Sequence, residues 1–356
     1  MKVLYAYRYG IIGGVSTQLL LRQRALETTG HEACLFFSQD NGLGQVLNNQ
    51  SQVMFGSQLS FQKLVRRGRF DAVVVIDSPE LLAAASGPLF RKNPVYLDVH
   101  TTTDAGLSYL LDLDAKYLAG VMVPTSYSAR LVRERLGEPA DIQVVPNILN
   151  TEVFHPDVEG NQLGGRPAAR EFVWVGKLDD HKNWRLALVY AGMLKDLLGN
   201  IRLHVVGGYT APPKRAEEFF DLAFRLGVSD SVSWLDRVEN TTLAGLYKRC
   251  AVSGGAMLVT SRDESFGMAA AESLLCGCPL IANDLPVFRE VFPPSPLVHL
   301  IDIWDPEQVA CAAHEVGVLS GREDLVGQVY KRLGDRYGSD AFVESFLSML
   351  GEHQSE

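Results

Sequence analysis

Two lysines and two glutamates in the second half of the chain have types and spacing that suit a phosphorylated ligand. Lys177 and Lys182 follow an apolar stretch that ends in Gly176. Glu264 lies in a polar turn, and Glu272 follows eight residues later. Eight residues are about two helical turns, so both carboxylates can face one groove. Lysines beyond the end of a parallel strand can neutralise a diphosphate, which makes these four residues candidates for one site.

Each of these residues also has an ordinary structural interpretation. Loop lysines are usually exposed to solvent, and an acid beside a helix start is favoured by the helix dipole. Glu272 is different because the helix around it is apolar on nearly every side. Such a helix is mostly buried, and a buried carboxylate needs a partner. We therefore expect Glu272 to be partnered.

The elements that would position this site form a strand, helix, strand unit. Met257–Thr260 is an apolar strand, and a second apolar strand follows Gly-Cys-Pro at residues 277–279. The turn before the intervening helix contains small residues that let a ligand approach the helix N-terminus, where phosphate binds. This turn is Ser265, Phe266 and Gly267, and Met268 opens the helix.

The first half of the chain alternates strands and helices. A strand at residues 2–7 leads through Gly13 and Gly14 into a helix expected at residues 17–29. Four further strands are expected at residues 33–37, 72–76, 95–99 and 120–124. This alternation predicts a doubly wound parallel sheet with its ligand crevice at the carboxyl ends of the strands. His100 lies at one such end, where a hydrogen-bonded histidine with no chemical role is the simpler interpretation.

Size and composition limit the class of protein. A chain of 356 residues that is 47% hydrophobic can bury a large core, and two domains are expected. The net charge of −9 argues against general nucleic-acid binding. Five scattered cysteines and no long apolar run favour a cytoplasmic protein. One basic cluster, Lys63 to Arg69, is either a solvated helix end or a contact for anionic lipid or an acidic acceptor.

The run E-S-F-G-M-A-A-A-E, followed by S-L-L-C-G-C-P-L-I-A, resembles the E-x-F-G-x-x-x-x-E and A-x-G-x-P-V-(I/V)-A signature of retaining, family-four-type glycosyltransferases. The resemblance implies the GT-B fold, with two Rossmann-like doubly wound domains facing a central cleft. It also implies that Glu264 faces the donor sugar and that Glu272 binds the nucleotide ribose.

Other matches to the family are partial. Lys182 matches the lysine of G-R-x-x-x-x-K-G, while Lys177 replaces the arginine and loses its bidentate geometry. In V-x-F-x-G-x-V, which contacts the nucleobase, Asp236 replaces glycine and Arg237 follows it. The resemblance assigns His100, Lys182 and Glu264 to catalysis. It assigns donor binding to Gly13, Gly14, Lys177, Arg237, Ser265, Phe266, Gly267, Met268 and Glu272.

The resemblance predicts an acceptor-side domain at residues 1–150, a nucleotide-sugar domain at 151–338, and a C-terminal helix at 339–356 that packs back on the first domain. The donor would be a nucleotide diphosphate-sugar, UDP- or GDP-linked, and the acceptor a small molecule, a glycan or a lipid-linked compound. No cofactor or metal is expected. The letters D-x-D occur at Asp112 and Asp114, where a helix surface is expected instead of a strand end.

Two other functions fit the same sequence. A nucleotide-sugar epimerase shares the two-domain architecture, although it would need acid and base residues for proton abstraction. A binding protein that has lost turnover is suggested by departures from the family pattern, namely Ile148, Asn150, Lys177 and Asp236.

Overall fold

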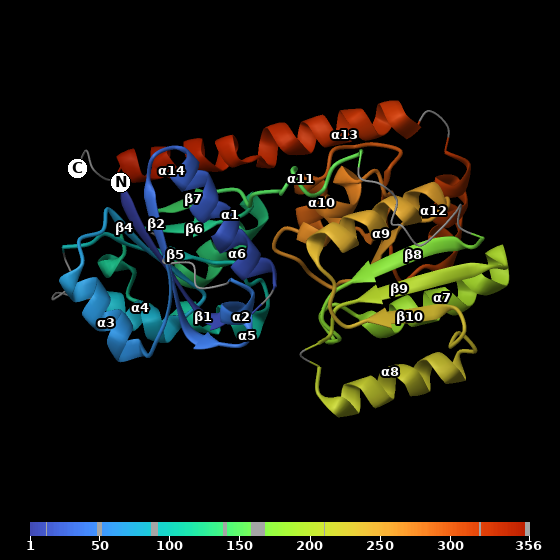
Figure 1. Cartoon of the computed structure of the whole chain (residues 1–356), viewed down its shortest axis with the longest axis horizontal. Helices are drawn as coiled ribbons and strands as arrows, with labels where there is room; N and C mark the ends of the chain where they lie inside the picture. The colour runs from blue at the N-terminus through green and yellow to red at the C-terminus, as the bar shows by residue number, and fades with distance from the viewer. Residues whose placement is uncertain are drawn as a thin grey trace. The chain divides into compact units, whose positions relative to one another are not determined.

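The chain folds into two compact units, Met1–Ile148 with Tyr337–Glu356 and Leu149–Arg336. The structure, a computed structural model, describes residues 1–11, 13–47, 52–86, 92–137, 141–157, 168–209, 211–319 and 322–352. Each unit is a parallel sheet with helices on its faces (Figure 1). The predicted fold class of two Rossmann-like α/β domains is therefore confirmed.

The sheet of the first unit has the strand order β3-β2-β1-β4-β5-β6-β7, and all its pairs are parallel. Its order reverses at β1 and β4, which places the loops that follow these strands at the switch point where such sheets bind ligands. The strands are β1 (Lys2–Gly10), β2 (Glu32–Asp40), β3 (Val53–Phe55), β4 (Ala72–Ile76), β5 (Val95–Asp98), β6 (Gly120–Val123) and β7 (Ile142–Val144).

Helices cover both faces of this sheet. One face packs against α1 (Gly14–Thr28) and the C-terminal α14 (Ser339–Glu352), which runs beside α1 in Figure 1. The other packs against α3 (Gln58–Arg67), α4 (Pro79–Ala85) and α6 (Ser126–Leu136). The shorter helices are α2 (Leu43–Val46), α5 (Asp104–Leu107), η2 (Ser108–Asp112) and η3 (Ala115–Tyr117).

The second unit has the strand order β10-β9-β8-β11-β12-β13, again parallel. Its switch point lies between β8 and β11, the strands that precede the candidate lysines and Glu264. The strands are β8 (Arg170–Val175), β9 (Ile201–Val206), β10 (Val232–Leu235), β11 (Met257–Val259), β12 (Leu280–Asn283) and β13 (Val298–Ile301).

The helices of the second unit complete a three-layer arrangement. One hydrophobic core lies between the sheet and α7 (Trp184–Leu198), α8 (Pro213–Arg225) and α12 (Pro306–Val318). On the other face, α9 (Asn240–Val252) and α10 (Met268–Leu275) pack on β8, β11 and β12. The remaining helices are α11 (Pro286–Val291) and α13 (Arg322–Tyr337).

Some expected boundaries were wrong. The first helix begins at Gly14, three residues before Thr17. The strands β3, β7 and β13 were not predicted, and β3 and β7 have only three residues each. An alternation of apolar and polar residues, the sequence signal of a strand, cannot be recognised over three residues. Within the described residues, no helix is long and apolar enough to cross a membrane.

Candidate functional site

The loop between β8 and α7, residues 176–183, is fixed by hydrogen bonds to its own residues and to the loop after β11. The backbone N–H of Lys182 donates to Asp179 Oδ1 at 2.8 Å. The backbone N–H of Arg262 donates to His181 O at 2.9 Å. Both loops leave the carboxyl ends of adjacent strands, so residues more than eighty positions apart in the sequence meet at one place.

Lys182 and Glu264 form an ion pair where the two loops meet. Lys182 Nζ lies 2.5 Å from Glu264 Oε1, and Ser261 Oγ donates to the same oxygen at 2.7 Å. The two side chains are 26% and 12% exposed. Water is therefore partly excluded, and the charge of Lys182 is held in a defined position by a rigid acceptor. The structure thus brings together two of the three residues assigned to catalysis.

Asn183, which ends this loop, adopts a left-handed backbone with φ 54° and ψ 44°. This is why glycine is usual at the position in the resembled family, since asparagine is the side-chain-bearing residue that tolerates this region best. Thr260 Oγ1 lies 3.0 Å from the carbonyl oxygens of Lys182 and Asn183, and it accepts from Trp174 Nε1 at 2.9 Å. The start of α7 is therefore tied to the end of β11.

The turn before α10 brings its backbone close to neighbouring side chains. Phe266 is buried, and Gly267 has a φ of 90°. A Cβ on Gly267 would come within 2.5 Å of Phe288 Cε1. Glycine is therefore required here by both conformation and space, and it has no side chain to cover the helix N-terminus. Ser265 and Met268 flank this position, as the sequence predicts.

Glu272 lies in the second turn of α10 with its side chain partly exposed. Burial raises the pKa of its carboxyl group to about 8. Burial also raises the pKa of Tyr247 and Cys276, with a smaller contribution from Glu272. Among the described residues, no hydrogen bond or ion pair reaches the carboxyl group of Glu272, so no protein group there supplies the partner that the sequence predicts. Because few water molecules compete for this carboxyl group, it can form hydrogen bonds with the hydroxyl groups of a ligand.

The other candidates of this unit lie at the surface. Lys177 is exposed just after the end of β8. Asp236 and Arg237 are exposed beyond the carboxyl end of the edge strand β10. Their neighbour Trp234 is fixed, because its Nε1 donates to Gly207 O at 2.7 Å. Lys177 and Arg237 therefore lie at the carboxyl-end edge of the sheet, and the roles assigned to them stay predictions.

Gly13 and Gly14 open α1 in the first unit. Gly13 is extended, with φ −177°, and a Cβ on either glycine would meet nothing within 4 Å. A tight turn with positive φ, the ordinary explanation for such glycines, is therefore absent at this position. What the two glycines provide is an uncovered helix N-terminus at the carboxyl end of β1.

His100 follows β5 and belongs to a polar cluster that was not predicted. Its Nε2 lies 3.0 Å from Asp98 Oδ2, and Arg22 Nη1 donates to that same oxygen at 2.5 Å. The backbone N–H of His100 donates to Asp77 Oδ2 at 2.9 Å, and Tyr109 Oη donates to Asp77 Oδ1 at 3.2 Å. His100 is thus hydrogen-bonded, as the simpler interpretation expects, and is also held in a fixed orientation at a strand end.

The two acids of this cluster have opposite pKa shifts. Burial would raise the pKa of Asp98, but the charges of Arg22 and His100 outweigh it and hold that pKa at about 2. Burial, with a contribution from Asp98, raises the pKa of Asp77 to about 6 against the opposing effect of His100. Asp77 also has a φ of 35°, unusual for a residue with a side chain. That strained backbone could not be read from the sequence.

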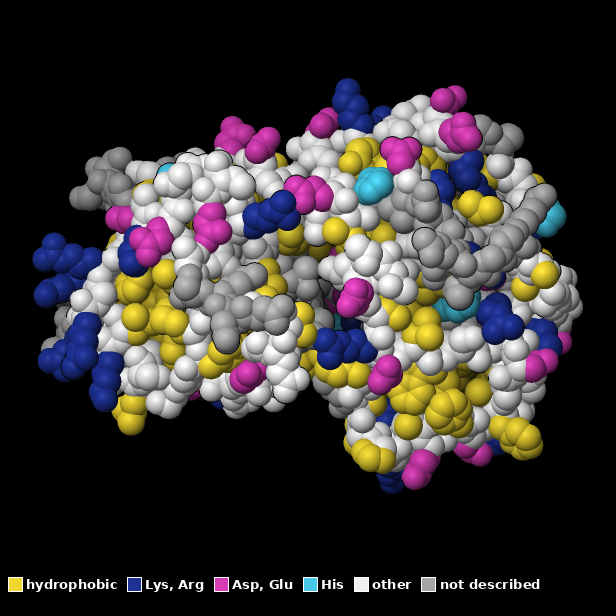
Figure 2. All heavy atoms as spheres, in the orientation of Figure 1, with side chains coloured by type: hydrophobic (Ala, Val, Ile, Leu, Met, Phe, Trp, Pro, Cys, Tyr) yellow, Lys and Arg dark blue, Asp and Glu magenta, His cyan; other side chains and the backbone are white. Residues whose placement is uncertain are grey.

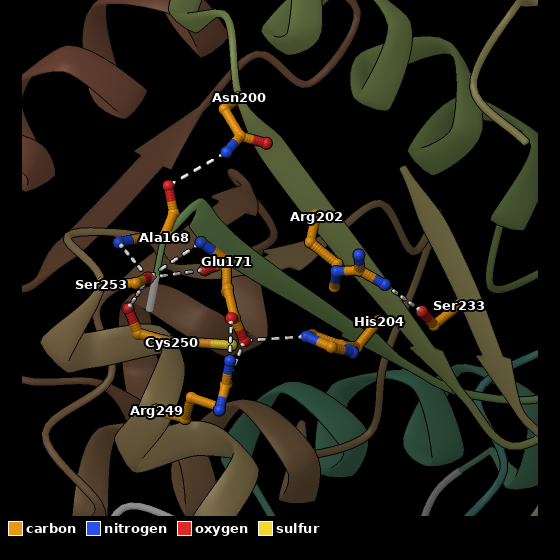
Figure 3. Close-up of polar contacts among 10 residues, drawn as sticks. Ala168, Glu171, Asn200, Arg202, His204, Ser233, Arg249, Cys250 and Ser253 are labelled. Carbon is orange, nitrogen blue, oxygen red and sulfur yellow. Dashed lines mark hydrogen bonds and ion pairs between the residues drawn. The ribbon is translucent and has the colours of Figure 1, made fainter. Parts of the chain in front are cut away.

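A second buried polar cluster lies at the other end of the second unit's sheet (Figure 3). Arg249 donates to both carboxylate oxygens of Glu171, at 2.6 and 2.7 Å, and His204 Nε2 lies 2.9 Å from Glu171 Oε2. Burial would raise the pKa of Glu171, but His204 and Arg249 lower it to about 2. Glu171 is the second residue of β8, at the opposite end of the strand from the Lys182 loop, so this cluster joins α9 to the sheet.

Among the described residues, no cluster of three or more histidine, cysteine, aspartate or glutamate side chains is placed to hold a metal ion. Asp112 and Asp114 are exposed in 3-10 turns that follow α5, as expected for a helix surface.

Comparisons with known proteins point to one family. Residues 161–295 match the model of glycosyl transferases group 1. The D-inositol 3-phosphate glycosyltransferase of Segniliparus rotundus is 26% identical over 224 residues, which is 62% of this chain and 49% of that protein. The protein of the same name from Nocardiopsis dassonvillei is 33% identical over 167 residues, 44% of this chain and 38% of that protein. The chain spans about half the length of the curated relatives it matches.

Solved structures show the same fold at low identity. Anabaena HepE in complex with UDP and glucose has a TM-score of 0.81 and 16% identity, over 99% of this chain and 100% of that chain. Sucrose-phosphate synthase from Thermosynechococcus elongatus has a TM-score of 0.80 and 15% identity over 100% of both chains. Residues 161–295 are therefore similar to the glycosyl transferases group 1 family, and the two units have the fold of the GT-B structures.

Proposed function

We propose that this protein is a retaining glycosyltransferase that moves a sugar from a nucleotide diphosphate-sugar to an acceptor hydroxyl. The observation that carries the proposal is the fixed Lys182–Glu264 pair at the sheet's switch point, beside the glycine that opens α10. Solved structures of Anabaena HepE contain UDP or UDP-glucose, which supports a UDP-linked donor over a GDP-linked one.

The chemistry follows from where negative charge develops. As the glycosidic bond breaks, the leaving diphosphate gains negative charge on the departing oxygen. Cations and helix N–H groups held around that oxygen stabilise the transition state more than the ground state, by roughly 3 kcal/mol for each well-placed donor. Lys182 and the N-terminus of α10 supply this stabilisation, Glu264 orients Lys182 and faces the sugar, and Glu272 holds the ribose hydroxyls.

Retention of the anomeric configuration follows if the acceptor attacks the face that the diphosphate leaves. The departing phosphate oxygen then takes the proton of the acceptor hydroxyl, so no separate protein base is needed. His100 contacts the transferred sugar, with its ring held by Asp98. Gly13 and Gly14 let the ligand approach the N-terminus of α1.

The test is turnover by variants of Lys182. We expect Lys182→Ala to lower turnover at least tenfold, because the leaving group loses its cation while the fold remains. Lys182→Met, which keeps the length of the side chain, should lose as much. Lys195→Ala is the matched control, since that half-buried lysine lies at the far end of α7 and pairs with Asp230. Full activity in purified Lys182→Ala would refute the assignment.

A donor screen separates this activity from the two alternatives. Nucleotide release from UDP-, GDP-, ADP- and dTDP-sugars is measured with and without acceptors, and inositol 3-phosphate is included because of the relatives' names. Release that depends on an acceptor supports transfer. An epimer formed from donor alone indicates an epimerase, and donor binding without any turnover indicates a binding protein.

A further inference from the structure

Five cations gather at the C-terminal end of α3. They are Lys63, Arg66, Arg67, Arg69 and Lys92, here called the α3 cation cluster, and all five are exposed. Figure 2 shows dark blue side chains gathered at the left edge of the molecule, over the part of the first unit where α3 lies in Figure 1. The function proposed above does not use any of them.

The architecture of α3 explains why these cations share a surface. Phe61 and Val65 are buried against the sheet, four residues apart. The opposite face, at spacings of four, three and one residues, carries Leu59, Lys63, Arg66 and Arg67.

Lys92 joins these residues because its neighbour Asn93 is bound to the end of the helix. Asn93 Nδ2 donates to Val65 O at 2.7 Å, and Phe70 N–H donates to Asn93 Oδ1 at 2.9 Å.

The cluster is not neutralised by the protein. The sequence contains no acidic residue between Asp40 and Asp71. In the part of the chain that the structure describes, no ion pair joins any member of the cluster to an acid, whereas the half-buried Lys2 and Lys195 are paired with Glu32 and Asp230. A favourable interaction with the helix dipole accounts for Arg66 and Arg67 in the last turn, but not for Lys63, Arg69 or Lys92.

An apolar residue accompanies these charges. Leu59 is 67% exposed in the first turn of α3, on the same face as Lys63. Positive charge beside an exposed leucine suits a lipid interface, where the cations meet anionic headgroups and the leucine enters the acyl boundary. Nucleic acid would use the charges only and would leave the exposed Leu59 without a role.

We infer that the outward face of α3 docks the protein on an anionic membrane surface through the α3 cation cluster and Leu59. Binding is peripheral and reversible, because five cations and one leucine supply far less than a membrane-spanning helix. The inference does not depend on the proposed transferase activity, and its test does not require turnover.

The test is co-sedimentation of the full chain with vesicles. Phosphatidylcholine vesicles that contain phosphatidylglycerol should bind the protein, and pure phosphatidylcholine vesicles should not. The triple variant Lys63→Gln/Arg66→Gln/Arg67→Gln should bind the anionic vesicles on the order of 100-fold more weakly, since each cation near such a surface contributes about fivefold. Raising the salt from about 0.1 M to about 0.5 M should weaken wild-type binding, because it shortens the screening length.

A matched control fixes the location of the surface. Lys214→Gln/Lys331→Gln/Arg332→Gln removes the same charge from exposed positions of the second unit and should bind like the wild type. Leu59→Ser, which keeps all charges, should weaken binding several-fold by losing apolar insertion. Circular dichroism verifies that each variant is folded. Failure of the wild type to bind anionic vesicles, equal losses in the two triple variants, or heparin binding without vesicle binding would each overturn the inference.

Discussion

At the scale of single residues, the proposed donor site contains two glutamates in contrasting electrostatic environments. Lys182 has an internal counterion, Glu264, so its charge is positioned before any ligand arrives. Glu272, in contrast, has no counterion among the described residues, although burial raises the pKa of its carboxyl group. An incoming ribose would therefore supply what the fold leaves out, and that gives Glu272 a measurable pH signature.

Glu272 should make the protein less stable as pH rises. Its pKa of about 8 in the folded state exceeds the usual value of a glutamate, so the native state binds more protons than the unfolded one. The free energy of unfolding then falls as pH rises toward 8, by at most about 1.4 kcal/mol per pH unit from this group. Asp77, with a pKa of about 6, contributes in the same direction only below that pH. The window from pH 6 to 8 therefore isolates Glu272.

Urea denaturation at several pH values in this window tests the point. The variant Glu272→Gln should lose the slope, and it should be more stable than the wild type at the upper end. Glu323→Gln, on the exposed start of α13, serves as control and should keep the wild-type slope. Equal slopes in wild type and Glu272→Gln would show that Glu272 is not held in its protonated form.

The sequence predicts the residues of the proposed donor site better than it predicts which charged side chains contact one another. The motif singles out Lys182 and Glu264, which the structure joins in an ion pair, and the left-handed backbone of Asn183 explains a departure from the motif. The Arg22–Asp98–His100 chain and the Glu171–Arg249–His204 cluster were missed. Their members are as far apart as 78 residues in the sequence, and only the packing of the sheet brings such charges together.

At the scale of elements, two helix starts use glycine for different reasons. Gly267 has positive φ and lies against Phe288, so the fold itself needs it. Gly13 has neither constraint. A comparison of the two positions therefore separates structural glycines from functional ones.

Gly267→Ala should destabilise the second unit by on the order of 1 to 3 kcal/mol, because it adds backbone strain and crowds a buried ring. Gly13→Ala should leave the melting temperature nearly unchanged, while donor or acceptor binding weakens because a methyl group then covers the start of α1. Thermal unfolding and nucleotide release by the two variants measure both effects. A Gly13→Ala protein with normal stability and normal activity would remove Gly13 from the site.

Short elements limited what could be predicted at this scale. The sequence predicts β4 with its observed bounds, because its five residues form a continuous apolar run that the structure buries. The three-residue strands β3 and β7 carry no comparable pattern. The amphipathic spacing of residues 340–350 predicts the helix that the structure shows as α14. The sequence pattern alone does not say which surface that helix covers.

At the scale of the whole molecule, the first unit is made from both ends of the chain. Residues 337–356 belong to the same compact unit as residues 1–148. From α14, buried apolar side chains enter the core beside β1 and α1, and the ring of Phe342 lies 5.2 Å from the guanidinium carbon of Arg22. These buried residues are Phe342, Val343, Phe346, Met349 and Leu350.

Removal of residues 339–356 should therefore unfold the first unit. Each lost side chain contributes about 1.5 to 3 kcal/mol of burial, so the loss is on the order of 10 kcal/mol, comparable to the stability of a whole domain. Hydrogen exchange of β1 amides should become fast in the shortened chain, while a chain lacking only residues 353–356 should keep its protection. Protected β1 amides without α14 would show that this helix is dispensable.

The account as a whole depends on where the nucleotide binds. The most direct measurement is a crystal structure of the full chain with UDP or another nucleoside diphosphate. We predict the diphosphate within hydrogen-bonding distance of Lys182 Nζ and the start of α10, with the ribose hydroxyls on Glu272. A nucleotide bound elsewhere, with Lys182 still paired only to Glu264, would contradict the proposed function.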